Sequence, residues 1–289
     1  MRMQPWQAEP AEYDVAITRL PLYAHLDTER HVNNVSVLEF HLEARLQLMM
    51  KGLGADSWHS DGVRLRPLRT VTQFVEQVHY GAPVTAAARL VEIGQSVFRI
   101  LSAVFQNGRC AGVQDCLMGA WVGSGWVELP NAVKTALSAV LHPVAGLEAL
   151  EQERGTFPSS WPCRWPLVSR YADLDSDRHL GELALYRYVE QARARPIYTL
   201  IEGGLGVVIA RLDTAFYRWD AMEADPGVDS GIHRVGNTSL GLAALTSTAG
   251  TPLVTAEAVI VLLDRETGRP TSVTPALRER LQPMLFASI

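Results

Sequence analysis

Hydrophobic and polar residues follow two different spacings along the chain, and these separate a long helix from strands. Residues 33–50 are rich in Leu, Met, Glu and Arg and contain no Gly or Pro, which predicts a helix of about five turns. Asn33 or Asn34 can cap its start, and Gly52 and Gly54 can end it. Apolar side chains spread over most of its circumference, so we expect other structure to surround it.

Strand-like runs flank this predicted helix, beginning with a run at residues 13–23. The runs after the helix cover about residues 62–67, 70–79, 84–93 and 96–122. The last run contains Asn107-Gly108, which favours a tight hairpin turn between two apolar stretches. The first half of the chain therefore predicts a strand, a loop, a long helix and a meander of antiparallel strands.

The second half of the chain repeats this order. It contains predicted strands at 163–171 and 206–219, a predicted helix at 181–201 and a predicted hairpin at 237–264. The hairpin turns at Ala249-Gly250, and Pro196 is expected to kink or end the helix. One long helix against a meandering antiparallel sheet, present twice, is an α+β plan.

Composition narrows the classes of protein that fit this plan. Hydrophobic residues make up 47% and charged residues 20% of the 289 residues, which suits a globular protein with a sizeable core. The formal net charge is −5 and there is no basic run, so nucleic acid is not an expected partner. No apolar run approaches the roughly 18 residues of a membrane span, and no signal peptide is visible. We therefore expect a soluble cytoplasmic protein.

Cysteine and histidine spacing gives no sign of a metal site. The chain has three cysteines, Cys110, Cys116 and Cys163. An odd number without metal-ligand spacing argues against both a disulfide framework and a zinc site. We expect neither a metal nor another cofactor.

A nonapeptide occurs twice in closely similar form. Tyr23–His31 reads YAHLDTERH, and Tyr171–His179 reads YADLDSDRH, with six of nine positions identical and an offset of 148 residues. A repeat at about half the chain length predicts an internal duplication. We expect two units, residues 10–135 and 160–289, joined by a linker at 136–159.

The residues around the first nonapeptide resemble a known signature. LDTERHVNN, residues 26–34, is similar to the Asp-x-x-x-His-Val-Asn-Asn signature of hot-dog-fold thioesterases, a group that includes hydroxybenzoyl-CoA and acyl-ACP thioesterases. Glu43-Ala44-Arg45 fits the same signature, and the second nonapeptide resembles the acyl-ACP branch. The resemblance implies a tandem, or double, hot-dog fold in one chain and an acyl-CoA or acyl-ACP thioester as substrate. It also allows a homodimer of such fused chains.

Several residues depart from that signature. Glu29 and Asp177 stand where the acyl-ACP branch usually has Asn, and Arg30 and Arg178 replace the small residue that commonly precedes the His. The second copy has Leu180-Gly181-Glu182 in place of Val-Asn-Asn.

Thioester hydrolysis needs a group that polarises the carbonyl. Backbone N–H groups at a helix start can do this, because they lack intrahelical acceptors and lie at the positive end of the helix dipole. The candidates for this substrate-binding role are the amides at Asn33 and Asn34 in the first copy and at Gly181 and Glu182 in the second.

The reaction also needs a carboxylate that activates water or attacks the carbonyl directly. By analogy with the family, Asp27 and Asp175 hold that place. His31 and His179 could orient the carboxylate, share a proton or contact the thioester, and the sequence leaves these roles open. A structural reading stands beside each, because an Asp before a helix is most often a cap or turn former.

The remaining candidates have simpler interpretations. Glu43, Arg45 and Arg193 are expected to be solvated or to pair along the helix.

Competing functions are a hot-dog hydratase or dehydratase acting on enoyl thioesters, and a non-catalytic protein that binds acyl thioesters. Between the two copies, Glu182 would oppose negative charge on the thioester oxygen, which favours Asp27 and His31 as the main catalytic pair.

Overall fold

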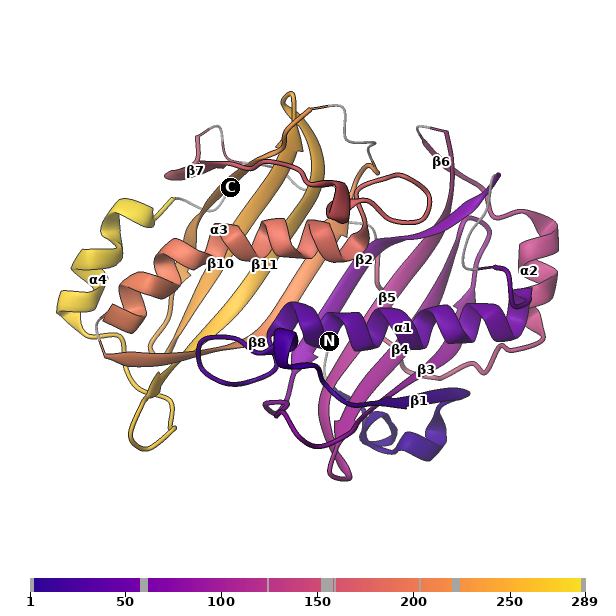
Figure 1. Ribbon diagram of the computed structural model, residues 1–289, viewed down its shortest axis with the longest axis horizontal. Coiled ribbons are helices and arrows are strands. Elements are labelled where there is room, and N and C mark those ends of the chain that lie inside the picture. The colour runs from indigo at the N-terminus through magenta and orange to yellow at the C-terminus, as the bar shows by residue number, and fades with distance from the viewer. Residues whose placement is uncertain are drawn as a thin grey trace. The chain divides into compact units, whose positions relative to one another are not determined.

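A computed structural model describes residues 3–57, 62–123, 125–151, 158, 160–202, 204–219 and 224–286. The chain divides into two compact units, Met1–Gln152 and Glu153–Ile289. This division lies inside the predicted linker at 136–159. In each unit a long helix lies across one face of a set of antiparallel strands (Figure 1).

The first unit contains a sheet with the strand order β1-β3-β4-β5-β2. Its strands are β1 Val15–Arg19, β2 Arg64–Phe74, β3 Val84–Ile93, β4 Val97–Gln106 and β5 Arg109–Val122, with the short β6 Gly125–Val127 paired to β5. Its helices are α1 Asn34–Leu53 and α2 Asn131–Ser138, and 3-10 turns lie at Pro5–Ala8, Pro10–Glu12 and Tyr23–His25. The predicted helix at 33–50 is therefore confirmed.

The second unit has the equivalent strand order, β7-β9-β10-β11-β8. Its strands are β7 Cys163–Pro166, β8 Leu205–Phe216, β9 Gly227–Val235, β10 Ser239–Thr248 and β11 Thr251–Asp264. Its helices are α3 Glu182–Glu202 and α4 Pro275–Leu281, and 3-10 turns lie at Tyr171–Asp173 and Gln282–Met284.

The two sheets agree in register as well as in order. Each has β-bulges, where one strand has an extra residue, at three matching places. These are Leu68 and Ala210, Val91 and His233, and Ala111 and Leu253. Because a one-residue shift turns every following side chain to the other face, matching bulges place corresponding side chains of the two units on the same face.

The core of each unit lies between its long helix and its sheet. In the first unit Phe40 and Leu48 of α1 pack in one buried cluster with Phe98 and Ile100 of β4. In the second unit Leu200 of α3 lies in a buried cluster supplied by the strands and α4. Burial of these apolar faces orients each helix, and with it the loop that precedes the helix.

Three elements differ from the sequence-based predictions. The runs at 62–67 and 70–79 contain one strand, β2 Arg64–Phe74, with a bulge inside it, and residues 75–79 lie beyond its end. Strand β9 was not predicted, because its Gly, Asp, Ser and Arg residues hide any apolar alternation. Helix α3 continues past Pro196 to Glu202, so Pro196 does not end it. Of the helices in the described ranges, none is both long enough and apolar enough to cross a membrane.

Candidate functional site

The first nonapeptide forms a narrow loop closed by backbone hydrogen bonds. The N–H of Asp27 donates to the carbonyl of His31 at 2.9 Å, and Leu26 bridges to Val32. Asp27 Oδ1 accepts from the N–H groups of Glu29 at 3.0 Å and His31 at 3.1 Å. This carboxylate oxygen therefore shapes the turn, whereas Oδ2 accepts no hydrogen bond from any described residue.

The second nonapeptide forms the same loop. The N–H of Asp175 donates to the carbonyl of His179 at 2.8 Å. Asp175 Oδ1 accepts from the N–H groups of Asp177 at 2.9 Å and His179 at 3.1 Å. Equivalent atoms thus make equivalent bonds in the two units. Each Asp therefore shapes its turn through Oδ1, and in the first unit this leaves Oδ2 of Asp27 without a hydrogen bond from any described residue.

The residue before each His has a left-handed backbone. Arg30 has a φ of 66° and Arg178 a φ of 62°, a region that non-glycine residues enter at a steric cost. Both arginine side chains are exposed.

The helix that follows each loop begins differently in the two units. Asn33 Oδ1 caps α1 by accepting the N–H of Val35 at 2.7 Å, while the N–H of Asn34 donates to no described residue. In the second unit Gly181 holds the capping place and has no side chain. A Cβ built on Gly181 would lie 3.4 Å from Cβ of Asp175, so this carboxylate sits directly beside the start of α3. Glu182 is 7% exposed in the first turn of α3.

The two histidines have different neighbours. The His31 ring packs edge-to-face on the His79 ring, with centroids 5.6 Å apart. His179 Nδ1 lies 2.8 Å from the carbonyl oxygen of Asp177. Because a carbonyl only accepts, this contact assigns the proton of neutral His179 to Nδ1 and leaves Nε2 as a hydrogen-bond acceptor.

Behind each loop lies a pair of residues that sequence reasoning did not single out. In the first unit the His25 ring packs edge-to-face on Phe40. In the second unit Asp173 stands at the position of His25 and accepts the Tyr188 hydroxyl at 2.8 Å. Arg170 also donates to Asp173, at 2.8 Å. The one signal in the sequence was the change from His25 to Asp173 between the two nonapeptides.

This network changes the acidity of its members. Burial alone would raise the pKa of Asp173, but hydrogen bonds from Arg170 and Tyr188 outweigh it and hold that pKa below its usual range. The pKa of Tyr188 is raised by burial and by the neighbouring Asp173 carboxylate. At neutral pH the pair is therefore a carboxylate that accepts from a phenol, and it anchors the second loop against α3.

Two residues expected to be solvated are buried. Arg45 is 0% exposed and Arg193 is 1% exposed, which corrects the prediction, because both lie on the helix face that packs against the sheet. Glu43, also predicted to be solvated or paired, forms an ion pair with Arg19 at 2.9 Å near the surface.

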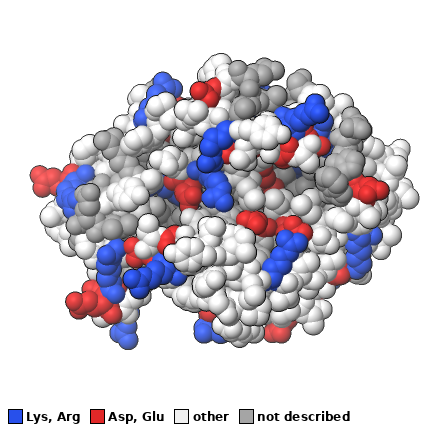
Figure 2. Space-filling view, viewed as in Figure 1, with Lys and Arg blue, Asp and Glu red and all other residues white. Residues whose placement is uncertain are grey.

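Neither a metal-ligand cluster within the described ranges nor a charged patch on the face in view marks a further site. Among the described residues, no group of three or more His, Cys, Asp and Glu side chains is placed to hold a metal ion. Figure 2 shows Lys and Arg interspersed with Asp and Glu over the visible face, without an extended patch of one sign.

Comparison with known proteins gives the class of fold. No protein-family model matches the chain, and no curated protein matches it in sequence. Among solved structures it is similar to a 12:0-ACP thioesterase from Umbellularia californica, with a TM-score of 0.74, 14% identity and coverage of 86% of this chain and 94% of that chain.

Two bacterial structures are similar over the same extent. A putative oleoyl thioesterase from Lactobacillus plantarum has a TM-score of 0.72 at 11% identity and covers 86% of this chain and 95% of its own. An acyl-ACP thioesterase from Bacteroides thetaiotaomicron has a TM-score of 0.66 at 11% identity and covers 85% and 97%. The chain therefore has the hot-dog type of fold found in these thioesterases, as the resemblance implied.

Proposed function

We propose that this protein hydrolyses acyl thioesters, with an acyl-CoA or acyl-ACP as substrate, and that it consists of two hot-dog units fused in one chain. The observation that carries the proposal is the loop that holds a carboxylate and a His against the start of a long helix, built alike in both units. The fold shared with solved thioesterases and the matching strand registers of the two units support it.

The proposed reaction uses the atoms that the loop leaves open. The thioester carbonyl oxygen accepts the N–H of Asn34 at the positive end of α1, which stabilises negative charge as it develops. Asp27 Oδ2 takes a proton from water while the water oxygen attacks the carbonyl carbon. The C–S bond then breaks, and the thiolate leaves and takes up a proton. His31 orients the carboxylate or passes on the proton.

Direct attack by Asp27 is the other form of this mechanism. It forms a mixed anhydride, which water then cleaves. A single turnover in ¹⁸O-water distinguishes the two. General-base hydrolysis puts the label in the released acid, whereas cleavage of the anhydride at the Asp27 carbon puts it in the Asp27 carboxylate.

We assign the main reaction to Asp27 and His31. The amide of Asn34 is available in the first unit, whereas in the second unit the buried Glu182 carboxylate lies in the first turn of α3. A negative charge there opposes the developing oxyanion. Asp175 and His179, with Gly181, form the second and weaker copy of the site.

The test is thiol release from a panel of acyl-CoA and acyl-ACP thioesters of increasing chain length. Hydrolysis by the wild type and its loss in an Asp27→Asn/Asp175→Asn double variant is the expected result. Absence of hydrolysis across the panel by a folded protein, with binding retained, would indicate the non-catalytic alternative. A change in absorbance of a trans-2-enoyl-CoA without thiol release would indicate a hydratase instead.

Two associated expectations stay predictions. A homodimer of fused chains would be seen as twice the mass of 31.8 kDa by light scattering. A cytoplasmic location would be tested by fractionating cells that produce the protein.

A further inference from the structure

Each long helix carries one fully buried arginine at the same position. Arg45 of α1 and Arg193 of α3 are 148 residues apart, like the two nonapeptides. Each follows a buried alanine and faces its own sheet. A guanidinium stays charged at any pH that the protein meets, so each must find acceptors or remain an uncompensated buried charge.

Arg45 has partners in its own unit. Its Nη1 lies 3.2 Å from Cys116 Sγ and 3.5 Å from Met118 Sδ, both on β5. The strand positions that match these in register in the second unit are Ala258 and Ile260 of β11. Neither of those side chains can accept a hydrogen bond.

Arg193 Nε, Nη1 and Nη2 are all buried, and none of them donates a hydrogen bond to a described residue. Burial lowers the pKa of Arg193, and the charge of Glu190, one turn earlier on α3, offsets this only in part. The strand positions that match Ser102 and Gln114 of the first unit are also alanines here, Ala244 and Ala256.

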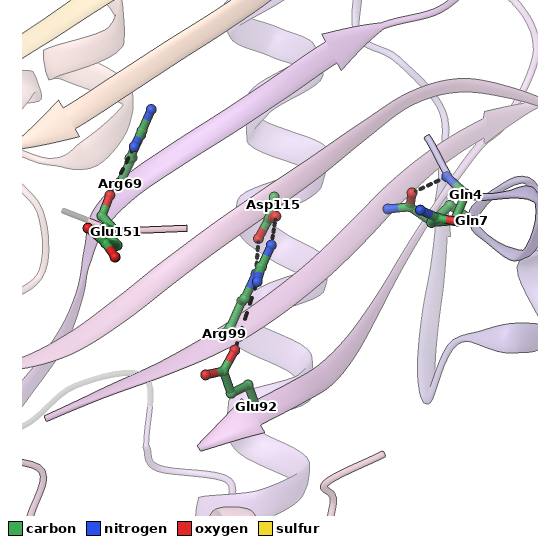
Figure 3. Close-up of polar contacts among 7 residues, drawn as sticks. All are labelled: Gln4, Gln7, Arg69, Glu92, Arg99, Asp115 and Glu151. Atoms are coloured by element: carbon green, nitrogen blue, oxygen red, sulfur yellow. Dashed lines mark hydrogen bonds and ion pairs between the residues drawn. The ribbon is translucent and has the colours of Figure 1, made fainter. Parts of the chain in front are cut away.

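Elsewhere the chain pairs a buried arginine fully. Arg99 of β4 is 4% exposed, and it donates to both carboxylate oxygens of Asp115, at 2.8 Å and 2.5 Å (Figure 3). Glu92 lies 3.8 Å from the same guanidinium. The contrast with Arg193 points to an acceptor that the folded chain does not itself supply.

We propose that Arg193 binds the carboxylate of a carboxylic acid with an apolar chain, held in the core of the second unit beneath α3. A guanidinium matches a carboxylate with two parallel hydrogen bonds, and at matching strand positions Ala244, Ala256 and Ala258 present small apolar groups where the first unit has Ser, Gln and Cys. Such an acid is what acyl-thioester hydrolysis releases. Its identification as the product rests on the proposed function, whereas its binding does not.

The test uses decanoate as the probe and 1-decanol as the matched probe without a carboxylate. Decanoate should raise the melting temperature of the wild type, and 1-decanol should not. Arg193→Met should weaken decanoate binding by about 30-fold or more, as expected for loss of a bidentate ion pair. The same variant without ligand should melt at or above the wild-type temperature, because an unpaired buried charge is replaced by an apolar side chain.

Arg45→Met is the matched control, since it removes the equivalent arginine of the first unit and should leave decanoate binding unchanged. Arg193→Lys keeps the charge but loses the two parallel donors of the guanidinium, and it should bind decanoate more weakly than the wild type does. In the wild type itself, ¹³C-carboxyl decanoate should titrate with a lower pKa when bound than when free.

Three results would overturn the proposal. These are no stabilisation of the wild type by decanoate, equal stabilisation of the wild type and Arg193→Met, and a large loss of stability in ligand-free Arg193→Met. Hydrolysis is measured separately. If the wild type binds decanoate, Arg193→Met does not, and the wild type hydrolyses no thioester, the proposed function is rejected and this binding site is kept.

Discussion

The cores beneath α1 and α3 have the same backbone plan and different chemistry. Beneath α1, His41 bonds Ser102 at 2.9 Å and Gln114 bonds Thr72 at 2.9 Å. At the positions of His41, Ser102 and Gln114 the second unit has Val189, Ala244 and Ala256. Strand register and bulges are therefore retained while side-chain chemistry changes, because the ladder depends on main-chain groups that every residue carries.

The loops before these helices show the reverse. Their hydrogen bonds agree to within 0.1 Å in the contacts that the Asp and His residues share. The support behind them has been exchanged as a pair, with His25 and Phe40 in one unit and Asp173 and Tyr188 in the other. Loop geometry is thus held constant by different means, which is expected if the loop carries the function.

The largest expected difference is between the two carboxylates. Asp27→Asn should reduce the hydrolysis rate by about 100-fold or more, because a general base or nucleophile is lost while the turn-forming oxygen remains. Asp175→Asn should have a smaller effect. Rates measured with the best acyl thioester decide this, and a dead Asp175→Asn beside a nearly unaffected Asp27→Asn would reverse the assignment.

Removing the phenol behind the second loop should be the next largest change. Tyr188→Phe deletes a buried hydrogen bond to the Asp173 carboxylate, which should cost about 2 kcal/mol of unfolding free energy. Urea unfolding measures it. Tyr198→Phe is the control, since Tyr198 is 59% exposed and should change little. Equal effects of the two substitutions would contradict the role given to Asp173.

Acid should destabilise the first core through His41. Burial, and then the nearby Arg45 charge, lower the pKa of His41 to about 3. Between its unfolded pKa near 6.5 and that value, only the unfolded state gains the proton, so stability falls as pH falls. From pH 7.5 to pH 5 this should amount to about 2 kcal/mol.

His41→Gln cannot take up this proton and should show a flatter dependence of unfolding free energy on pH. The quantity compared is the slope of unfolding free energy against pH. A loss of stability that His41→Gln shows equally at every pH therefore does not affect the comparison. Parallel curves for the wild type and the variant would show that His41 takes up the proton equally in the folded and unfolded states.

The smallest expected effect is at the left-handed residues. Arg30→Asn and Arg178→Asn should each stabilise the fold by about 1 kcal/mol or less, because Asn tolerates positive φ better than Arg. Thermal unfolding measures the gain. A clear loss of stability in either variant would show that the arginine side chain makes a stabilising contact.

The sequence predicted the parts of this molecule that depend on local signals. Asn33 was a candidate cap and does cap α1, and Asn107-Gly108 forms the turn between β4 and β5. Strand β9 gave no such signal, because its Gly, Asp, Ser and Arg residues hide any apolar alternation.

The candidate site divides in the same way. The Asp and His of the repeated nonapeptide, given their roles by the family resemblance, occupy equivalent loops. Burial of Arg45 and Arg193 could not be predicted, since a charged residue on a helix is expected to face water. Their burial becomes visible only when each helix is packed on its sheet.

The matching bulges also bear on how the chain reaches its native state. Because β4-β5 and β10-β11 share one register, a strand from one hairpin could pair with the complementary strand of the other and satisfy nearly every main-chain group. Such exchanged pairings are characteristic errors of chains with repeated units. Synthesis from the N-terminus lets the first hairpin close before the second emerges from the ribosome, so refolding of the full-length chain from denaturant should be slower and lower in yield than folding during translation.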